Sequence, residues 1–248
     1  MNSILEIKNL SFGYTKDKLV LEDLNIQFNE GEIIALLGKN GCGKSTLLDC
    51  IIGANQYQGF VFVDGINSKE YSEKELAKKI AYIPQNLIIN IDYSVRDFIS
   101  FGRNPYKGLF ENLSNEEYEM IESNAKVCGV YDLLDNDITK ISGGERQLVF
   151  IARALTQDSK IIVMDEPLSA LDFGNQQRLF RLLLELKRKG KTIIFTTHNP
   201  NHLTEINAAI YAMKNGTINK IEELTVDSLN DIYDDEFALK DGYFNFKI

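Results

Sequence analysis

Short apolar segments and amphipathic segments alternate along most of this chain of 248 residues. Apolar or alternating segments that predict strands cover residues 4–12, 23–28, 32–38, 59–65 and 80–85. The segment EIIALLG at 32–38 is apolar throughout, which is typical of a strand buried on both faces. A glycine-rich turn follows this segment and leads into a predicted helix that Gly53 ends.

The pattern becomes helical from Ser94 to about Gln157. Within this stretch, Ser114 and Glu117 have the spacing of a capping box, and Gly129 is placed to end the helix that they begin. We therefore expect an inserted helical lobe in the middle of the chain.

Strands and helices alternate again after the lobe. Further segments predict strands or a hairpin at 160–167, 191–198 and 209–218. We expect a helix that Asp172 caps and that ends before Gly190. One face of this helix carries four leucines, Leu179, Leu182, Leu183 and Leu186. Another helix is expected from about Pro200, and the acidic stretch from about Glu222 carries no informative pattern. The alternation predicts a mostly parallel sheet covered on both faces.

The composition is that of an ordinary soluble globular protein, with 44% hydrophobic and 25% charged residues. A net charge of −9 argues against broad nucleic-acid binding, so no nucleic-acid partner is expected. The sequence shows neither a secretion signal nor an apolar run near the roughly 18–20 residues of a membrane span. Cys42, Cys50 and Cys128 lack metal-type spacing and are expected to be reduced thiols.

Residues 38–46 carry the strongest chemical motif. The segment GKNGCGKS fits the P-loop pattern and lies between a predicted strand and a predicted helix, as that pattern requires. Backbone N–H groups of such a loop surround the α- and β-phosphates of a nucleotide. Lys44 would reach the β- and γ-phosphate oxygens, and the Ser45 hydroxyl would bind Mg²⁺. The alternative is a glycine turn that only packs.

Polar residues follow three other predicted strands. Asp165 is expected to hold Mg²⁺ through water, and Glu166 to polarise the attacking water as general base, a role worth typically 10²–10⁴-fold in rate. His198 ends a strand, and strand ends in this type of fold face the ligand crevice, which suits contact with a γ-phosphate. Gln85 can contact Mg²⁺ or water. Taken singly, each of these residues would more often be structural or solvated.

A second helix start has the features of an anion site. In residues 141–155 (ISGGERQLVFIARAL), Ser142, Gly143 and Gly144 precede an amphipathic run. The first backbone N–H groups of that helix are then available to an anion, and the helix dipole favours negative charge there. The simpler interpretation is a Ser N-cap followed by glycines.

Together these motifs resemble those of ATP-binding-cassette (ABC) ATPases. GKNGCGKST is similar to the Walker A motif of that family, IIVMDE to its Walker B motif and ISGGERQ to its signature. Gln85 matches the Q-loop, residues 169–172 (SALD) the D-loop, and His198 the switch histidine. The resemblance runs from about Leu5 to Ile218. It departs from the usual Leu, Gln and Thr at Ile141, Glu145 and Leu168.

The resemblance implies an α/β fold of the P-loop NTPase (RecA-like) type, with a mostly parallel sheet, a small antiparallel β subdomain and an inserted helical subdomain. Residues 1–248 would form a single ABC ATPase domain. Within it, the resemblance places the RecA-like core with the antiparallel part at 1–90 and 158–221, the helical signature subdomain at 91–157, and a short C-terminal extension at 222–248.

The resemblance also implies ATP and Mg²⁺ as ligands, with Tyr14 stacked on the adenine. The nucleotide-binding residues would be Tyr14, Gly38, Asn40, Gly41, Gly43, Lys44, Ser45, Thr46, Ser142, Gly143, Gly144 and Asp172. The catalytic residues would be Glu166, His198, Gln85 and Lys44. The metal-binding residues would be Ser45, Gln85 and Asp165.

Two copies pack head-to-tail in this family, and the resemblance implies the same here. The Ser-Gly-Gly turn of one copy would close over the ATP held by the Walker A motif of the other. This arrangement would explain why one chain carries two helix N-termini that suit a phosphate. Hydrolysis would remove the shared γ-phosphate, weaken both half-sites and open the pair.

Three local stretches, FGRNPY, ALDFGNQ and FTTHNPN, are similar to importer ATPases for iron chelates, haem, cobalamin and molybdate. The expected function is therefore ATP hydrolysis that energises import of such a substrate. The chain would be peripheral to the cytoplasmic face of the cell membrane, bound to integral membrane permease subunits and served indirectly by an extracytoplasmic substrate-binding protein. The alternatives are an ABC exporter ATPase and a non-transport ABC ATPase such as an iron-sulfur assembly scaffold.

Overall fold

The computed structural model describes residues 3–15, 17–89, 91–108 and 111–247. The chain forms two compact units, of which the first comprises residues 1–70 and 187–248 and the second residues 71–186. The structure determines the geometry inside each unit. The subdomain boundaries expected from the sequence remain a prediction.

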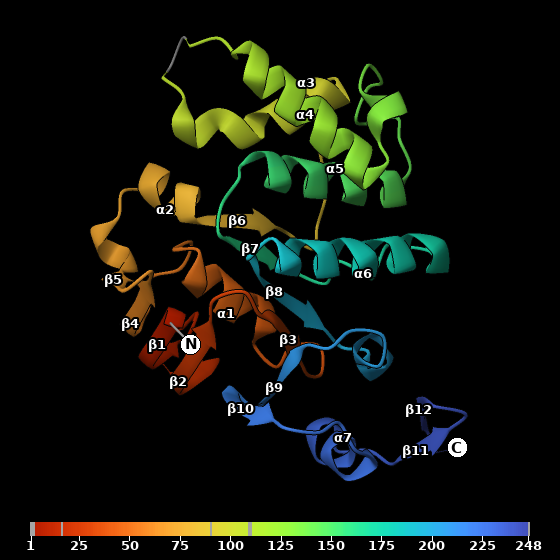
Figure 1. The fold of residues 1–248 in the computed structure, drawn as a ribbon. Helices are drawn as coiled ribbons and strands as arrows, with labels where there is room; N and C mark the ends of the chain where they lie inside the picture. Colours follow the sequence, from red (N-terminus) through yellow and green to blue (C-terminus); the bar gives the residue numbers. More distant parts are fainter. Residues whose placement is uncertain (1–2, 16, 90, 109–110, 248) are drawn as a thin grey trace. The chain divides into compact units, whose positions relative to one another are not determined.

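The first unit contains an antiparallel sheet with strand order β2-β1-β4-β5 (Figure 1). Its strands are β1 (Ser3–Phe12), β2 (Leu21–Asn29), β4 (Gln58–Val63) and β5 (Ile66–Asn67). In β2 the buried side chains alternate with exposed ones through Leu24, Ile26 and Phe28, as a sheet covered on one face requires. This sheet confirms the expected small antiparallel part.

The same unit contains strands in the order β10-β9-β3-β8. They are β3 (Ile33–Leu37), β8 (Thr192–Thr197), β9 (Ala209–Lys214) and β10 (Thr217–Ile221). β3 is parallel to both β8 and β9, while β9 and β10 form the expected hairpin. Every residue of β3 and β8 is buried, which explains why these segments are apolar throughout. Helix α1 (Lys44–Ile51) follows β3 through the glycine-rich turn.

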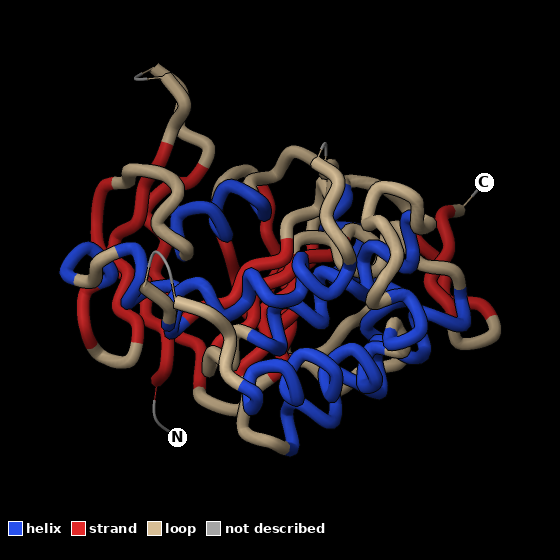
Figure 2. The backbone as a smooth tube through the Cα atoms, turned by 90° about the horizontal axis from the view of Figure 1, so that it is seen from above, coloured by secondary structure: helices blue, strands red, loops and turns tan. Residues whose placement is uncertain are grey.

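The stretch from Glu222, which showed no informative pattern in the sequence, contains a helix and a hairpin. Helix α7 (Val226–Tyr233) begins with a capping box formed by Thr225 and Ser228. A hairpin of β11 (Phe237–Lys240) and β12 (Tyr243–Phe246) follows, next to the C-terminus in Figure 2. Asp241 and Gly242 in its turn have φ angles of 53° and 83°, as a tight two-residue hairpin turn requires.

The helix expected from Pro200 is only a 3-10 turn, η4 (Pro200–Leu203). Asn199 caps it by accepting a hydrogen bond from the backbone N–H of Asn201. The Asn201 side chain forms two hydrogen bonds with the backbone of Phe244.

The second unit combines two parallel strands with the helical lobe. The strands are β6 (Ile80–Ile83) and β7 (Ile161–Met164). The helices are α2 (Glu73–Lys79), α3 (Val95–Ser100), α4 (Asn115–Cys128), α5 (Gly143–Thr156) and α6 (Phe173–Arg188, reaching into the first unit). Short 3-10 helices are η1 (Ser68–Glu70, in the first unit), η2 (Phe101–Tyr106) and η3 (Tyr131–Leu133). α5 packs against α3, α4, η2 and β6 and is central to this unit (Figure 1).

Helix starts and ends in this unit follow the sequence signals. Ser114 and Glu117 form the expected capping box of α4, and Gly129 ends that helix with a left-handed φ of 66°. Asp172 caps α6 by accepting a hydrogen bond of 2.8 Å from the backbone N–H of Asn175. The helical lobe is therefore confirmed as helical.

The three cysteines are free, as expected, with Cys50 and Cys128 buried. Within the described part of the chain, no helix has both the length and the apolar character that a membrane crossing demands.

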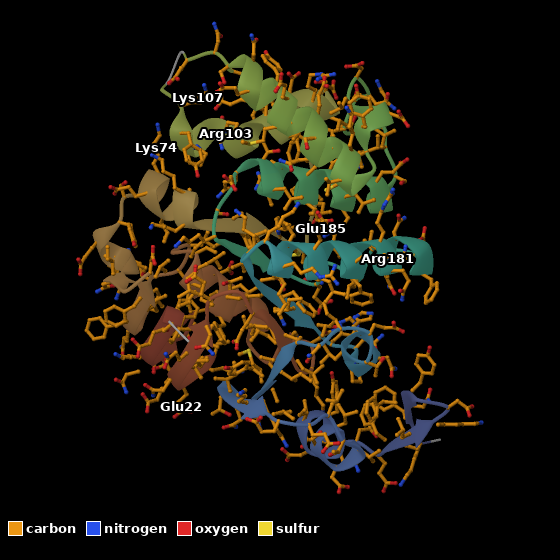
Figure 3. The ribbon with its side chains drawn as sticks, viewed as in Figure 1. Glu22, Lys74, Arg103, Lys107, Arg181 and Glu185 are labelled. Atoms are coloured by element: carbon orange, nitrogen blue, oxygen red, sulfur yellow. The ribbon has the colours of Figure 1, made fainter. Side chains whose placement is uncertain are left out.

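The FGRNPY stretch forms η2 and fastens it to α4 and α5. The Arg103 side chain donates hydrogen bonds of 3.1 Å each to the Glu117 carboxylate and to the Thr156 carbonyl. A Cβ at Gly102 would lie 2.4 Å from the Arg153 carbonyl oxygen, so only glycine permits this approach. Lys107 also pairs with Glu117, and Figure 3 shows Lys74, Arg103 and Lys107 close together.

Burial raises the pKa of Glu117, but hydrogen bonds from Lys107, the Ser114 backbone and Arg103 outweigh burial and lower that pKa to about 2. A carboxyl group with a lowered folded-state pKa stabilises the fold above its unfolded pKa. Its contribution disappears as the pH falls through the folded pKa.

We expect Glu117→Gln to destabilise the protein at pH 7 by about 2–3 kcal/mol, because two cations lose their buried partner. The difference from wild type should shrink as the pH falls from about 4.5 towards 2, where Glu117 itself becomes neutral. Urea unfolding at several pH values measures this difference. The exposed Glu116 of the same helix turn provides a matched Glu→Gln control. An equal stability gap at every pH would contradict the assignment.

Candidate functional site

The P-loop lies in the first unit, between β3 and α1. Gly41 and Gly43 have φ angles of 79° and 109°, a backbone conformation that glycine adopts without strain. A Cβ at Gly38 would lie 2.4 Å from the Met213 carbonyl oxygen. Lys44 is 5% exposed, and its ammonium donates hydrogen bonds to the carbonyls of Gly38 and Lys39 at 2.9 and 3.0 Å. The Lys44 side chain therefore folds back across the loop to its first two residues.

The start of α1 is open to an anion. Its N-cap, Gly43, makes no side-chain capping hydrogen bond, and the first turn holds no acidic residue. By contrast, α2, α4, α5 and α7 all begin with capping boxes. The first N–H groups of α1 and its positive dipole end therefore suit phosphate.

His198 lies at the same sheet edge as the P-loop. Leu37 of β3 pairs with Thr197 of β8, and the Gly38 N–H donates to the Thr197 carbonyl at 3.4 Å. Because the strands are parallel, the residues that follow them, Gly38 and His198, emerge side by side. Lys39, Asn40 and His198 share the rim of a cavity of about 540 Å³.

Tyr14 lies over the first turn of α1. It is 68% exposed, and its hydroxyl is 3.2 Å from the Thr46 hydroxyl. The Phe12 ring packs against it edge to face, with ring centroids 5.0 Å apart. An exposed aromatic face beside a phosphate loop suits a flat base.

The acidic pair lies at a sheet edge of the second unit. Ile83 of β6 pairs with Met164 of β7, and the Asp165 N–H donates to the Ile83 carbonyl at 2.9 Å. Asp165, Glu166 and Gln85 therefore follow neighbouring parallel strands and emerge at one edge. Asp165 and Glu166 are 3% and 9% exposed, whereas Gln85 is exposed. Glu166 holds a left-handed φ of 47°, a strained conformation of the kind that gathers at functional sites.

Helix α5 ties the signature turn to the strand that leads to Gln85. The half-buried Arg153 donates to the Tyr82 carbonyl at 3.2 Å, and Gln157 donates to the Ile80 carbonyl at 2.9 Å. Both acceptors belong to β6. A displacement of α5 would therefore act on the strand that carries Gln85.

The signature turn at the start of α5 is open on its outer side. Gly143 has nothing within 4 Å of the position a Cβ would occupy. Ser142 accepts a hydrogen bond from the Glu145 N–H, and the Glu145 carboxylate accepts one of 2.8 Å from the Ser142 N–H. Hydrogen bonds from the hydroxyl and the backbone N–H of Ser142 to the Glu145 carboxylate lower the pKa of Glu145. The Ser142 N–H is therefore used within the chain, while the turn itself is exposed.

The D-loop lies beside the signature turn in the same unit. A Cβ at Gly144 would lie 3.7 Å from the Ala170 carbonyl oxygen. Both carboxylate oxygens of Asp172 accept hydrogen bonds from Asn175, at 2.8 and 3.2 Å. Asp172 thus serves as the cap of α6.

Residues of the C-terminal segment also border the site, and the sequence interpretation missed them. The Tyr233 hydroxyl donates to the His198 carbonyl, and Asp234 pairs with Lys39 of the P-loop. The Thr225–Ser228 capping box and the Asp-Gly hairpin turn were the available sequence signals.

Comparison with known families gives a consistent result. The family model described as "ABC transporter" matches residues 21–169. A second model, described as an AAA domain, AbiEii toxin of a type IV toxin–antitoxin system, matches residues 135–204.

Two curated relatives cover most of both chains. The molybdate import ATP-binding protein MolC of Haemophilus influenzae is 36% identical over 208 residues, which span 83% of this chain and 77% of MolC. The iron(3+)-hydroxamate import ATP-binding protein FhuC of Bacillus subtilis is 34% identical over 239 residues, which span 94% of this chain and 88% of FhuC.

Solved structures share the fold. An inward-facing metal-chelate type ABC transporter matches with a TM-score of 0.82 and 32% identity, over 98% of this chain and 96% of that chain. The ATP-binding cassette MJ1267 in its ADP conformation matches with a TM-score of 0.76 and 27% identity, over 88% and 90% of the two chains.

We expect Gly38→Ala to deform the P-loop, because its Cβ would lie 2.4 Å from a backbone carbonyl. The cost in stability should be about 1–3 kcal/mol, the range for an overpacked site, and phosphate-dependent nucleotide binding should weaken with it. Thermal unfolding with and without ATP measures both effects. Gly174→Ala is the matched control, since its Cβ would meet only the Asp172 side chain, at 3.5 Å. Unchanged ATP stabilisation of Gly38→Ala would contradict the expected role of this turn.

Proposed function

Since this chain belongs to the ABC transporter family and is an ATPase that powers transport, we propose that it energises the import of a metal chelate or oxyanion. An iron-siderophore, haem or cobalamin is the substrate class that we favour. The names of the relatives support this proposal, because FhuC imports iron(3+)-hydroxamate and the FepC protein of Escherichia coli transports ferric enterobactin.

The observation that carries the proposal is the chemistry gathered at the two strand edges. One edge presents the P-loop and His198, and the other presents Asp165, Glu166 and Gln85. We assign the phosphates of ATP to the backbone N–H groups of residues 38–46 and to Lys44. The uncapped start of α1 fits a phosphate there. Gly38 and Gly43 set the shape of the loop, because a Cβ at either position would collide with Met213 or Leu21.

Mg²⁺ is assigned to Ser45, Asp165 and Gln85, all of which offer oxygen ligands. Among the residues that the structure describes, no group of three or more His, Cys, Asp or Glu side chains could hold a metal by itself. This donor set suits Mg²⁺, which proteins commonly hold through one or two carboxylates together with substrate phosphates, and Asp165 would supply one carboxylate. When bound, the ion would neutralise charge on the phosphates.

Glu166 is assigned as the general base and His198 as a contact of the γ-phosphate. The backbone of Glu166 is held in its left-handed turn by two hydrogen bonds from Ser169, at 3.2 Å from its N–H and 2.9 Å from its hydroxyl. This fixed turn would orient the carboxylate towards water. Tyr14 is assigned to the adenine, because its exposed ring lies beside Thr46.

We further propose that two copies share each ATP. In the signature turn, Ser142 and Gly143 are exposed and Gly144 is half-buried. A Cβ at Gly143 would meet nothing within 4 Å. The phosphate held by the P-loop of one copy would meet the N–H groups of this turn from the other copy. Asp172 would take its place in the same interface.

The dimer would bind integral membrane permease subunits at the cytoplasmic face of the membrane. It would hydrolyse Mg²⁺-ATP. An extracytoplasmic substrate-binding protein would deliver the cargo. The helical lobe, tied to Gln85 through α5 and β6, would pass movement between ATP and the permease.

Glu166→Gln tests the carboxylate chemistry. We expect ATP to bind with nearly unchanged affinity, while hydrolysis falls by about 10²-fold or more because the general base is lost. The ATP-bound chain should then accumulate as a dimer. Phosphate release and light scattering measure the two effects. The exposed Glu185 of α6, labelled in Figure 3, provides the control variant Glu185→Gln. Wild-type turnover by Glu166→Gln would refute the assignment.

The double variant Ser142→Ala/Gly143→Asp tests the shared site. The new carboxylate has open space in its own chain but would repel the phosphate held by a partner copy, so ATP binding should persist and hydrolysis should be lost.

Mixing this variant with a Lys44→Ala chain should restore part of the hydrolysis. A mixed pair contains one site with an intact P-loop from one copy and an intact signature from the other. Normal hydrolysis by the double variant alone, or no recovery in the mixture, would count against shared sites.

A further inference from the structure

The C-terminal segment contacts the loop that carries His198. The hydroxyl of Tyr233, the last residue of α7, donates a hydrogen bond of 2.6 Å to the His198 backbone carbonyl. This is a short O–H···O hydrogen bond. Tyr233 is 7% exposed. A backbone atom of the switch residue is therefore fixed by a side chain 35 positions later in the chain.

The Tyr233 side chain is itself held firmly. Lys214 of β9 pairs with Asp231 at 3.1 Å and with Asp234 at 2.8 Å, on either side of Tyr233. The Phe237 ring packs against the tyrosine ring with centroids 5.3 Å apart. The end of α7 is thus fastened to the sheet, and the direction of the hydroxyl is set by that anchor.

A second pair of hydrogen bonds holds the other side of the loop. The Asn201 side chain donates to the Phe244 carbonyl at 2.9 Å and accepts from the Phe244 N–H at 2.8 Å. The loop between β8 and η4 is therefore fixed at His198 and at Asn201 by different elements of the C-terminal segment. α7 and the β11–β12 hairpin lie together at the blue end of the chain (Figure 1).

The same segment reaches the P-loop. Asp234, directly after Tyr233, forms an ion pair of 3.3 Å with Lys39. Tyr233, Asp234, Lys39, Asn40 and His198 all line the cavity of about 540 Å³ described above. Tyr233 and Asp234 thus contact both the loop that carries His198 and the P-loop.

We propose that Tyr233 is a positioning residue for His198. By fixing the His198 carbonyl, its hydroxyl sets the backbone orientation from which the imidazole projects, and so the approach of the imidazole to the γ-phosphate. The inference rests on the proposed function, because it takes His198 as a contact of that phosphate. It adds the C-terminal segment to the machinery of hydrolysis.

Tyr233→Phe is the sharpest test, since it keeps the ring and removes only the hydroxyl. In the full-length chain we expect kcat for ATP hydrolysis to fall about three- to tenfold, the effect of one lost hydrogen bond. KM for ATP should change less than twofold, because the phosphates stay on the P-loop. Tyr243→Phe in the exposed part of β12 is the matched control and should leave both constants unchanged.

A second arm separates positioning from general structural support. His198→Ala should lower kcat, and Tyr233→Phe added to it should lower kcat no further, because the hydroxyl acts through the imidazole. Equal kcat for Tyr233→Phe and wild type, while His198→Ala is impaired, would overturn this inference and leave the proposed function intact. A further loss of kcat in the double variant would also overturn it. Wild-type activity of His198→Ala would overturn the phosphate contact itself, and this inference with it.

Discussion

Parallel pairing of strands is the interaction on which the site depends. Leu37 pairs with Thr197, and Ile83 pairs with Met164, so each pair ends level at one edge of its sheet. A shift of either pair by one residue would exchange the two faces of each strand. Because side chains on both faces are buried and close-packed, each of them would then have to fit a different neighbour. Burial of the strands therefore fixes where Gly38, His198, Asp165 and Glu166 emerge.

The sequence allowed the local elements of this arrangement to be predicted where hydrophobic periodicity and capping signals agreed. EIIALLG became β3, the Ser114–Glu117 box began α4, and Asp172 capped α6. The C-terminal segment has local signals too, namely the capping box of Thr225 and Ser228 and the Asp241-Gly242 turn. They were missed because the segment is acidic and shows no clear hydrophobic periodicity. The capping box of Ser72 and Glu75 at the start of α2 was missed in the same way.

Contacts between distant residues could not be predicted from the pattern. The hydrogen bond from Tyr233 to His198 and the pair of Asn201 with Phe244 depend on how the chain returns to the sheet, which periodicity does not encode. The left-handed backbone of Glu166 is likewise imposed by the turn after β7. The sequence also did not show that the helix expected at Pro200 would be only the 3-10 turn η4.

The two helix starts differ in charge as well as in capping. At α5, Glu145 accepts the Ser142 N–H and places a carboxylate beside the remaining donors of the turn. A phosphate that approaches this turn meets attraction from the helix dipole and repulsion from Glu145. Forces between exposed charges decay over a Debye length, about 8 Å at physiological ionic strength. In the proposed shared site, the affinity of this turn for a phosphate would therefore depend on ionic strength, because salt screens both the helix dipole and the charge of Glu145. The uncapped start of α1 has no such opposing charge in its own first turn.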